Sequence, residues 1–155
     1  MSMIMLDKKA LEGLPLKLLI TVMIIALSVQ PLFGSLSYLA YAQNLGGAVE
    51  EAEAVKRAAL SAFIGGPGNV RKVTLHLGEG SASFSIRLGG DEGEGRSRTI
   101  DVLWHGNVAA SVALEGQGLS IISLEGKDII IDGNQDLRLS CWERASGDVV
   151  IAEVL

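Results

Sequence analysis

The residues of this chain that could do chemistry are few, and the most suggestive group is a run of oxygen-bearing side chains near the C-terminus. Asp132, Asn134 and Asp136 alternate along the chain, and Glu143 lies eleven residues after Asp132. These are positions 1, 3, 5 and 12 of an EF-hand calcium loop, in which carboxylate and amide oxygens surround the ion. The sixth position, however, is Leu137, where the sharp turn of that loop needs glycine.

A turn between two strands explains the same residues more simply. Asp132-Gly133-Asn134 is typical of a tight hairpin turn, and residues 137–141 alternate between apolar and polar as a strand does. We therefore expect no dedicated metal site and keep Asp132, Asn134 and Asp136 only as weak calcium candidates. A second weak group belongs to the glycine-rich segment 89–95, which we interpret as a flexible surface loop: Asp91, Glu92, Glu94.

The other reactive side chains do not form a catalytic set. No spacing brings His76, His105 and Cys141 into a metal-ligand pattern. The chain has no Gly-x-Ser-x-Gly motif, and the acids of the glycine-rich segment have the wrong charge for holding phosphate. Cys141 lies in an alternating apolar run, which predicts a buried structural thiol. We expect that the protein is not an enzyme and holds no cofactor.

An apolar segment near the N-terminus gives the strongest signal in the chain. A transmembrane helix needs about 20 apolar residues, and residues 18–42 contain only Ser, Thr, Gln and Tyr as polar members. Gln30-Pro31 should bend this helix, and Tyr38 and Tyr41 fall near its far end, where aromatic rings prefer the headgroup layer. We expect the large apolar side chains of this segment to contact lipid or neighbouring helices. They are Leu18, Ile20, Ile24, Leu27, Leu32 and Leu36.

The charges around this segment predict its orientation. Lysines precede it and a glutamate cluster at 50–53 follows it, which favours an N-terminus inside the cell and a C-terminal domain outside. Two processing sites compete with a simple anchor. Ala40-Tyr41-Ala42 fits an ordinary signal peptidase and would leave a secreted domain beginning at Gln43. Cleavage after Glu12-Gly13 would instead keep the apolar helix on the mature protein.

The second arrangement resembles the class III signal peptide of archaeal type IV pilins. Their precursors carry a charged leader, then a charged residue and glycine before the cleaved bond, then an apolar helix. Here Glu12 and Gly13 precede the bond and Leu14 follows it, after a leader that holds Asp7 and two lysines. The resemblance, which covers about the first 65 residues, implies cleavage by a membrane-embedded prepilin peptidase. It also implies self-association with other pilin subunits through helices bundled into a filament core.

The chain is thereby divided into four segments: 1–13 as the leader peptide, 14–45 as the transmembrane or polymerisation helix, 46–66 as an amphipathic helix and 67–155 as an extracellular β-domain. Gly46-Gly47 interrupts the apolar run, and apolar residues then recur at helical spacing from Ala48 to Phe63. Gly65-Gly66-Pro67-Gly68 ends this second helix.

From residue 70 onward the apolar period changes to two, which predicts seven or eight short antiparallel strands separated by glycine-containing turns. Trp104 and Trp142 each end such a strand, and we expect both in the core, with an exposed subunit contact or adhesive patch as the alternative. The fold class is therefore α+β: a long N-terminal hydrophobic helix continuing into an amphipathic helix, packed on a C-terminal antiparallel β-sheet or small β-sandwich. The predicted strands lie at 73–77, 84–88, 100–104, 108–114, 119–124, 128–131, 137–142 and 149–155.

Charge narrows the functional classes. After Gln43 the chain has 16 acidic and 10 basic residues, so no basic face for nucleic acid is expected. We expect a structural subunit of an archaeal type IV pilus-like surface filament, anchored in the cell membrane before assembly. The alternative is a single-pass anchored extracellular domain for binding or adhesion that does not polymerise, which Lys17 and Pro31 favour modestly. Cell membrane localisation is common to both.

Overall fold

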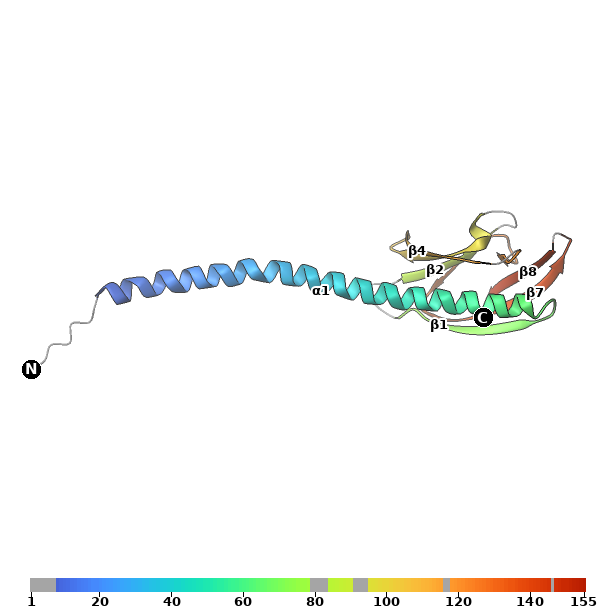
Figure 1. Cartoon of the computed structure of the whole chain (residues 1–155), viewed down its shortest axis with the longest axis horizontal. Helices are drawn as coiled ribbons and strands as arrows, with labels where there is room; N and C mark the ends of the chain where they lie inside the picture. Colours follow the sequence, from blue (N-terminus) through green and yellow to red (C-terminus); the bar gives the residue numbers. More distant parts are fainter. Residues whose placement is uncertain (1–7, 79–83, 91–94, 116–117, 146) are drawn as a thin grey trace, which may run out of the picture. The chain divides into compact units, whose positions relative to one another are not determined.

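The structure is a computed structural model that describes residues 8–78, 84–90, 95–115, 118–145 and 147–155. The chain forms two compact units, residues 1–40 and residues 41–155. A single long helix, α1 (Lys8–Ile64), precedes a region of β-strands (Figure 1). The predicted α+β class is therefore confirmed, with a long N-terminal helix packed on β-structure that is mostly antiparallel.

Helix α1 runs through Pro15, Pro31 and Gly46-Gly47 without an interruption, so the predicted break at the two glycines is wrong. Each glycine in a helix interior costs about 1 kcal/mol relative to alanine. Fully burying a Leu or Val side chain contributes roughly 1.5–3 kcal/mol, and Leu45 and Val49, both half-buried, pack against the core beside the glycines together with the buried Ala48. Tertiary packing therefore outweighs the weak helix propensity of this pair.

The last part of α1 buries the predicted apolar stripe. Ala48, Ala52, Val55 and Ala59 are each at most 5% exposed, and Phe63 packs partly against the same core. Small alanine side chains allow the helix axis to approach the strands closely. The helix ends where the glycine run predicts, because Gly66 adopts a φ of 78° and its N–H donates to the Phe63 carbonyl.

Eight strands form two four-stranded sheets. The first sheet has the order β1-β7-β8-β5 and the second has the order β4-β3-β2-β6, and a 3-10 helix, η1 (Gly95–Arg98), precedes β3. All strands lie within two or three residues of a predicted strand. Their bounds are β1 Val70–His76, β2 Phe84–Gly89, β3 Thr99–Trp104, β4 Asn107–Ala113, β5 Ile121–Ser123, β6 Asp128–Asp132, β7 Asn134–Arg144 and β8 Gly147–Val154.

One hydrophobic core joins the buried stripe of α1 with both sheets. Leu75, Leu137 and Leu139 reach it from the first sheet, and Ile86 and Val102 reach it from the second. A smaller cluster of Ile122, Val149 and Ile151 covers the opposite side of the first sheet. The β-domain thus resembles the predicted small sandwich, with the helix contributing to its interior.

Three local expectations are wrong. The strands are not all antiparallel, since β5 pairs with β8 in parallel. Asp132-Gly133-Asn134 is not a hairpin turn, because β6 pairs with β2 while β7 pairs with β1 and β8, so the chain changes sheets at Gly133. Gly89 and Gly90 do not begin a surface loop: both are buried, with φ of 90° and 118° that favour glycine.

Candidate functional site

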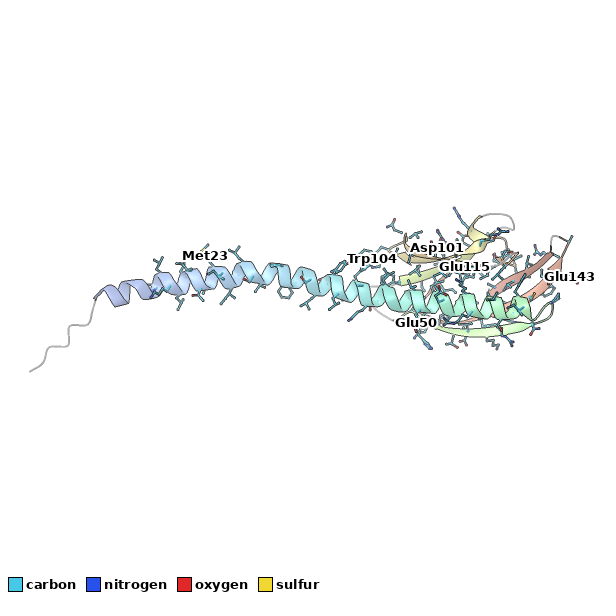
Figure 2. All side chains as sticks on the ribbon, in the orientation of Figure 1. Met23, Glu50, Asp101, Trp104, Glu115 and Glu143 are labelled. Carbon is cyan, nitrogen blue, oxygen red and sulfur yellow. The ribbon has the colours of Figure 1, made fainter. Side chains whose placement is uncertain are left out.

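The apolar segment of α1 is the first candidate site, because its side chains are unburied on every side. Among its described residues, Leu27 is 69% exposed and Phe33 is 67% exposed. Figure 2 shows side chains, Met23 among them, projecting from both sides of this part of the ribbon. A helix that is apolar all round belongs in a core or a membrane. By length and composition this helix can cross a bilayer.

The serine and threonine side chains within the apolar segment form hydrogen bonds with their own helix. All four Ser and Thr hydroxyls between residues 18 and 42 donate to the carbonyl four residues earlier, at distances of 2.8–3.0 Å. A bilayer interior offers no water, so an unpaired hydroxyl there is costly. These bonds let the segment carry hydroxyls into an apolar medium. The donors are Thr21, Ser28, Ser35 and Ser37.

The sequence-predicted residues of this segment lie in α1, but not all of their side chains are described. Leu18, Ile20, Ile24, Leu27 and Leu36 are exposed, at 48–69% of their full surface. The side chain of Leu32 lies outside the described residues.

The backbone of the predicted processing site is also part of α1. The side chains of Glu12 and Leu14 lie outside the described residues, as does the start of the leader. The assignment of Glu12, Gly13 and Leu14 as a cleavage site therefore stays a prediction.

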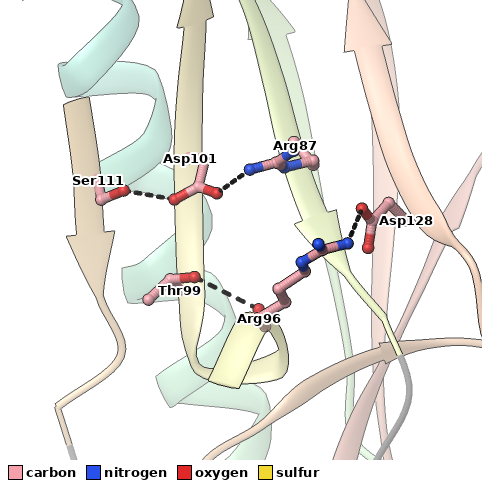
Figure 3. A network of polar contacts seen from close by, with 6 residues as sticks. All are labelled: Arg87, Arg96, Thr99, Asp101, Ser111 and Asp128. Atoms are coloured by element: carbon pink, nitrogen blue, oxygen red, sulfur yellow. Dashed lines mark hydrogen bonds and ion pairs between the residues drawn. The ribbon is translucent and has the colours of Figure 1, made fainter. Parts of the chain in front are cut away.

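A polar network on the second sheet was not predicted from the sequence (Figure 3). Arg87 on β2, Asp101 on β3 and Ser111 on β4 lie opposite one another in register. The Arg87 guanidinium is 2.6 Å from one Asp101 carboxylate oxygen, and the Ser111 hydroxyl donates to the other. Asp101 is only 8% exposed. A second ion pair joins Arg96 and Asp128 at 3.3 Å.

The network around Asp101 fits a structural role, because both carboxylate oxygens already have partners within the sheet. The three residues join three adjacent strands in one row. No buried side-chain nitrogen or oxygen in the described part of the chain lacks a hydrogen-bond partner. Each of the three residues occupies a polar position in an alternating strand. The sequence therefore predicts which face of the strand it lies on, but not which residues of the adjacent strands lie beside it.

Replacing Asp101 by asparagine is expected to lower the free energy of unfolding by about 1–3 kcal/mol, because it leaves the Arg87 charge without its partner. Urea unfolding of the detergent-solubilised chain, followed by tryptophan emission, measures this loss. Asp132→Asn is the matched control, since Asp132 is exposed and should change stability by less than about 0.5 kcal/mol. Equal midpoints for the two variants would contradict a stabilising network.

The weak calcium candidates do not form an EF-hand loop. Asp132 ends β6, whereas Asn134 and Asp136 belong to β7, an extended strand that continues to Arg144. In the described part of the chain, no group of three His, Cys, Asp or Glu residues is placed to hold a metal ion. His76 pairs with Asn134 across β1 and β7, and His105 lies in the β3–β4 turn. Asp91, Glu92 and Glu94 lie outside the described residues.

Cys141 is buried, as predicted, at 1% exposure. Burial raises the pKa of the Cys141 thiol, and the negative charge of Asp148 raises the pKa further. The thiol therefore stays protonated at neutral pH, which makes it a poor nucleophile.

The outer face of the first sheet carries a groove with a volume of about 530 Å³. Val70, Leu124 and Trp142 contribute apolar walls, and Arg138 and Glu153, 3.8 Å apart, contribute a charged edge. Trp142 is 57% exposed, so its predicted place in the core is wrong. The residues of β7 that face the core are Leu137, Leu139 and Cys141, and Trp142 is out of phase with them.

Trp104 is also not fully buried, at 38% exposure. Its ring packs against Tyr41 of α1, with 4.8 Å between the ring centroids, and against Phe84 at 6.4 Å. Trp104 is in phase with the buried residues of β3, so the predicted inward face is right. Trp104 is the last residue of β3, and part of its indole remains open there.

Comparison with protein-family models, curated proteins and solved structures finds no match for this chain. A long apolar helix followed by a two-sheet β-domain is what the structure establishes. The likeness to pilins therefore depends on residues of the N-terminal segment.

Proposed function

We propose that this protein is a structural, non-enzymatic subunit of an archaeal type IV pilus-like surface filament. The apolar segment of α1 holds the chain in the membrane until a prepilin peptidase cleaves after Gly13. The mature helices then pack against one another, and the β-domains face outward. Partners are thus the membrane, the peptidase and other copies of the chain.

The observation that carries this proposal is the exposure of large apolar side chains along the first part of α1. Fourteen of them between Leu16 and Leu39 are 38–73% exposed, and fully burying one such side chain contributes roughly 1.5–3 kcal/mol. Counting only the exposed part, covering all fourteen contributes on the order of 10–20 kcal/mol, which is at least as large as the net stability of about 5–15 kcal/mol of a typical domain. Lipid or neighbouring apolar helices must therefore cover this surface.

The mass of the native protein tests the processing step. We expect the mature chain to begin at Leu14, with fibres containing it in sheared surface material viewed by electron microscopy. A chain that still begins at Met1 would contradict assembly by the pilin route and leave only anchoring. A soluble chain that begins at Gln43 would contradict both.

Gly34→Leu is expected to reduce filament assembly while leaving membrane insertion unchanged. A Cβ atom added at Gly34 meets nothing within 4 Å apart from the adjacent backbone of its own helix, and leucine is a good helix former, so the variant can form the same helix. Small residues let membrane helices approach closely, and a contact weakened by about 1.4 kcal/mol lowers an association constant about tenfold.

Counting fibres per cell at equal amounts of membrane-inserted chain measures this effect. Gly34→Ala is the control, because a methyl group widens the helix only slightly. If Gly34→Leu assembles as well as Gly34→Ala, close helix packing at this position is not part of assembly.

A second candidate function is a membrane-anchored binding or adhesion module that does not polymerise. The groove beside Trp142 favours it, because an exposed indole next to an ion pair is typical of binding surfaces. In cells that show no fibres, Trp142→Ala should then reduce the adhesion of the cells to a surface. Such a loss would support this alternative.

A further inference from the structure

An aromatic cluster marks the end of the β-domain at which α1 joins it. Tyr41, the first residue of the second unit, lies 4.8 Å from Trp104 and 5.7 Å from Phe84 between ring centroids. The Trp104 ring also contacts His105, at 4.7 Å. Trp104 and His105 belong to the β3–β4 hairpin, so this hairpin touches the helix at Tyr41.

The covalent chain fixes how near this hairpin is to the apolar segment. Tyr41 directly follows Ala40, the last residue of the first unit. Whatever direction residues 1–40 take, the Trp104 ring contacts Tyr41, the residue that directly follows them. The aromatic cluster therefore lies at the end of the predicted membrane span.

The hairpin has the chemistry of a membrane–water interface. His105 and Gly106 form a two-residue turn, with φ of 50° and 78°, that places Trp104 opposite Asn107. Trp104 is 38% exposed and Val108 is 53% exposed. Residues 102–113 contain no Asp, Glu, Lys or Arg. Tryptophan and tyrosine prefer the headgroup layer because their rings are apolar with one polar group.

The opposite end of the β-domain differs. Figure 2 shows Trp104 and Glu143 at opposite ends of this unit. Trp142, next to Glu143, follows Cys141, whose N–H donates to the Asn69 carbonyl just beyond the end of α1. From Tyr41 to the end of α1 at Ile64 the helix extends roughly 35 Å. The two tryptophans therefore report on separate ends of the same unit.

We propose that the tip of the β3–β4 hairpin docks into the headgroup layer of the membrane that anchors the chain. Trp104 and Val108 reach the lipid from opposite faces of the hairpin tip, because Val108 pairs with Leu103, and Tyr41 links the tip to the span. This proposal rests on the membrane anchoring of the proposed function. It adds a second point of attachment, which holds the β-domain against the bilayer before assembly.

Fluorescence quenching by brominated phospholipids tests this contact in the full chain reconstituted into phosphatidylcholine vesicles. Trp142→Phe leaves Trp104 as the single reporter, and Trp104→Phe leaves Trp142. We expect at least a roughly twofold loss of Trp104 emission in the brominated vesicles, because the headgroup layer borders the brominated acyl chains. Trp142 emission should change little, and acrylamide in the water should quench Trp142 more strongly than Trp104.

Equal responses of the two tryptophans to brominated lipid, in a chain that resists alkaline extraction, would overturn the hairpin contact and leave the anchoring intact. Loss of the chain from the vesicles on alkaline extraction would contradict the anchoring itself. A third result would also overturn the lipid contact: Trp104 is protected from acrylamide but is not quenched by brominated lipid, and the protection disappears when the chain is diluted with more lipid. Trp104 would then contact a second copy of the protein.

Discussion

Replacing both Ile24 and Leu27 by lysine is expected to abolish integration of the chain into the membrane. The two side chains are 59% and 69% exposed in the apolar segment of α1. A lysine near the centre of a membrane helix costs about 2.5–3.5 kcal/mol, whereas Ile or Leu contributes about −0.3 to −0.6 kcal/mol. The double variant therefore loses about 6–8 kcal/mol, which shifts the insertion equilibrium by on the order of 10⁴ to 10⁶.

Alkaline extraction of sedimented membranes, followed by detection of the chain in pellet and supernatant, measures this loss. The control exchanges the same two residues for similar ones, Ile24→Leu with Leu27→Ile, and should stay in the pellet. If the lysine variant resists extraction as the control does, residues 18–42 are not the element that holds the chain in the bilayer. Both the filament and the anchored-module proposals would then fail.

The elements of the fold could be predicted because each has its own local period. Apolar residues at helical spacing from Ala48 to Phe63 correctly predicted the buried face of α1, and alternation correctly located all eight strands. The end of the helix followed from its glycines. The continuity of α1 through Gly46-Gly47 did not, because the packing of Leu45 and Val49 that outweighs the glycines comes from strands distant in sequence.

The arrangement of the strands could not be predicted, because alternation indicates which face of a strand is buried but not which strand lies beside it. Asp132-Gly133-Asn134 has the sequence of a hairpin turn and yet joins strands of different sheets. For the same reason, the row of Arg87, Asp101 and Ser111 has no signature in the sequence. Its members become partners only when β2, β3 and β4 align in register.

The two tryptophans show how far residue type alone can mislead. The size and aromatic ring of Trp142 favour the core, although its phase relative to Leu139 and Cys141 indicates the outer face. Trp104 has the right phase, and its exposure reflects its position at the end of β3 beside Tyr41. The phase of a residue within its strand therefore predicts its burial better than its hydrophobicity does. Its position along the strand determines how complete that burial is.

Val55→Asp is expected to unfold the β-domain or to lower its free energy of unfolding by at least about 4 kcal/mol. Val55 is 0% exposed and lies between Ala52 and Ala59 on the stripe of α1 that joins both sheets in one core. A carboxylate there must either remain charged without a partner or take up a proton, and both cost free energy. Such a loss approaches the whole stability of a typical domain, about 5–15 kcal/mol.

Urea unfolding of the detergent-solubilised full chain measures this effect, because Trp104 and Trp142 both belong to the β-domain and report its two ends. Asn44→Asp is the matched control, since it places the same carboxylate at an exposed position of the same helix and should change stability by less than about 0.5 kcal/mol. If the two variants unfold at the same urea concentration, α1 does not form part of the core. The β-domain would then be stable without the helix, and anchoring and folding would be separate properties of the chain.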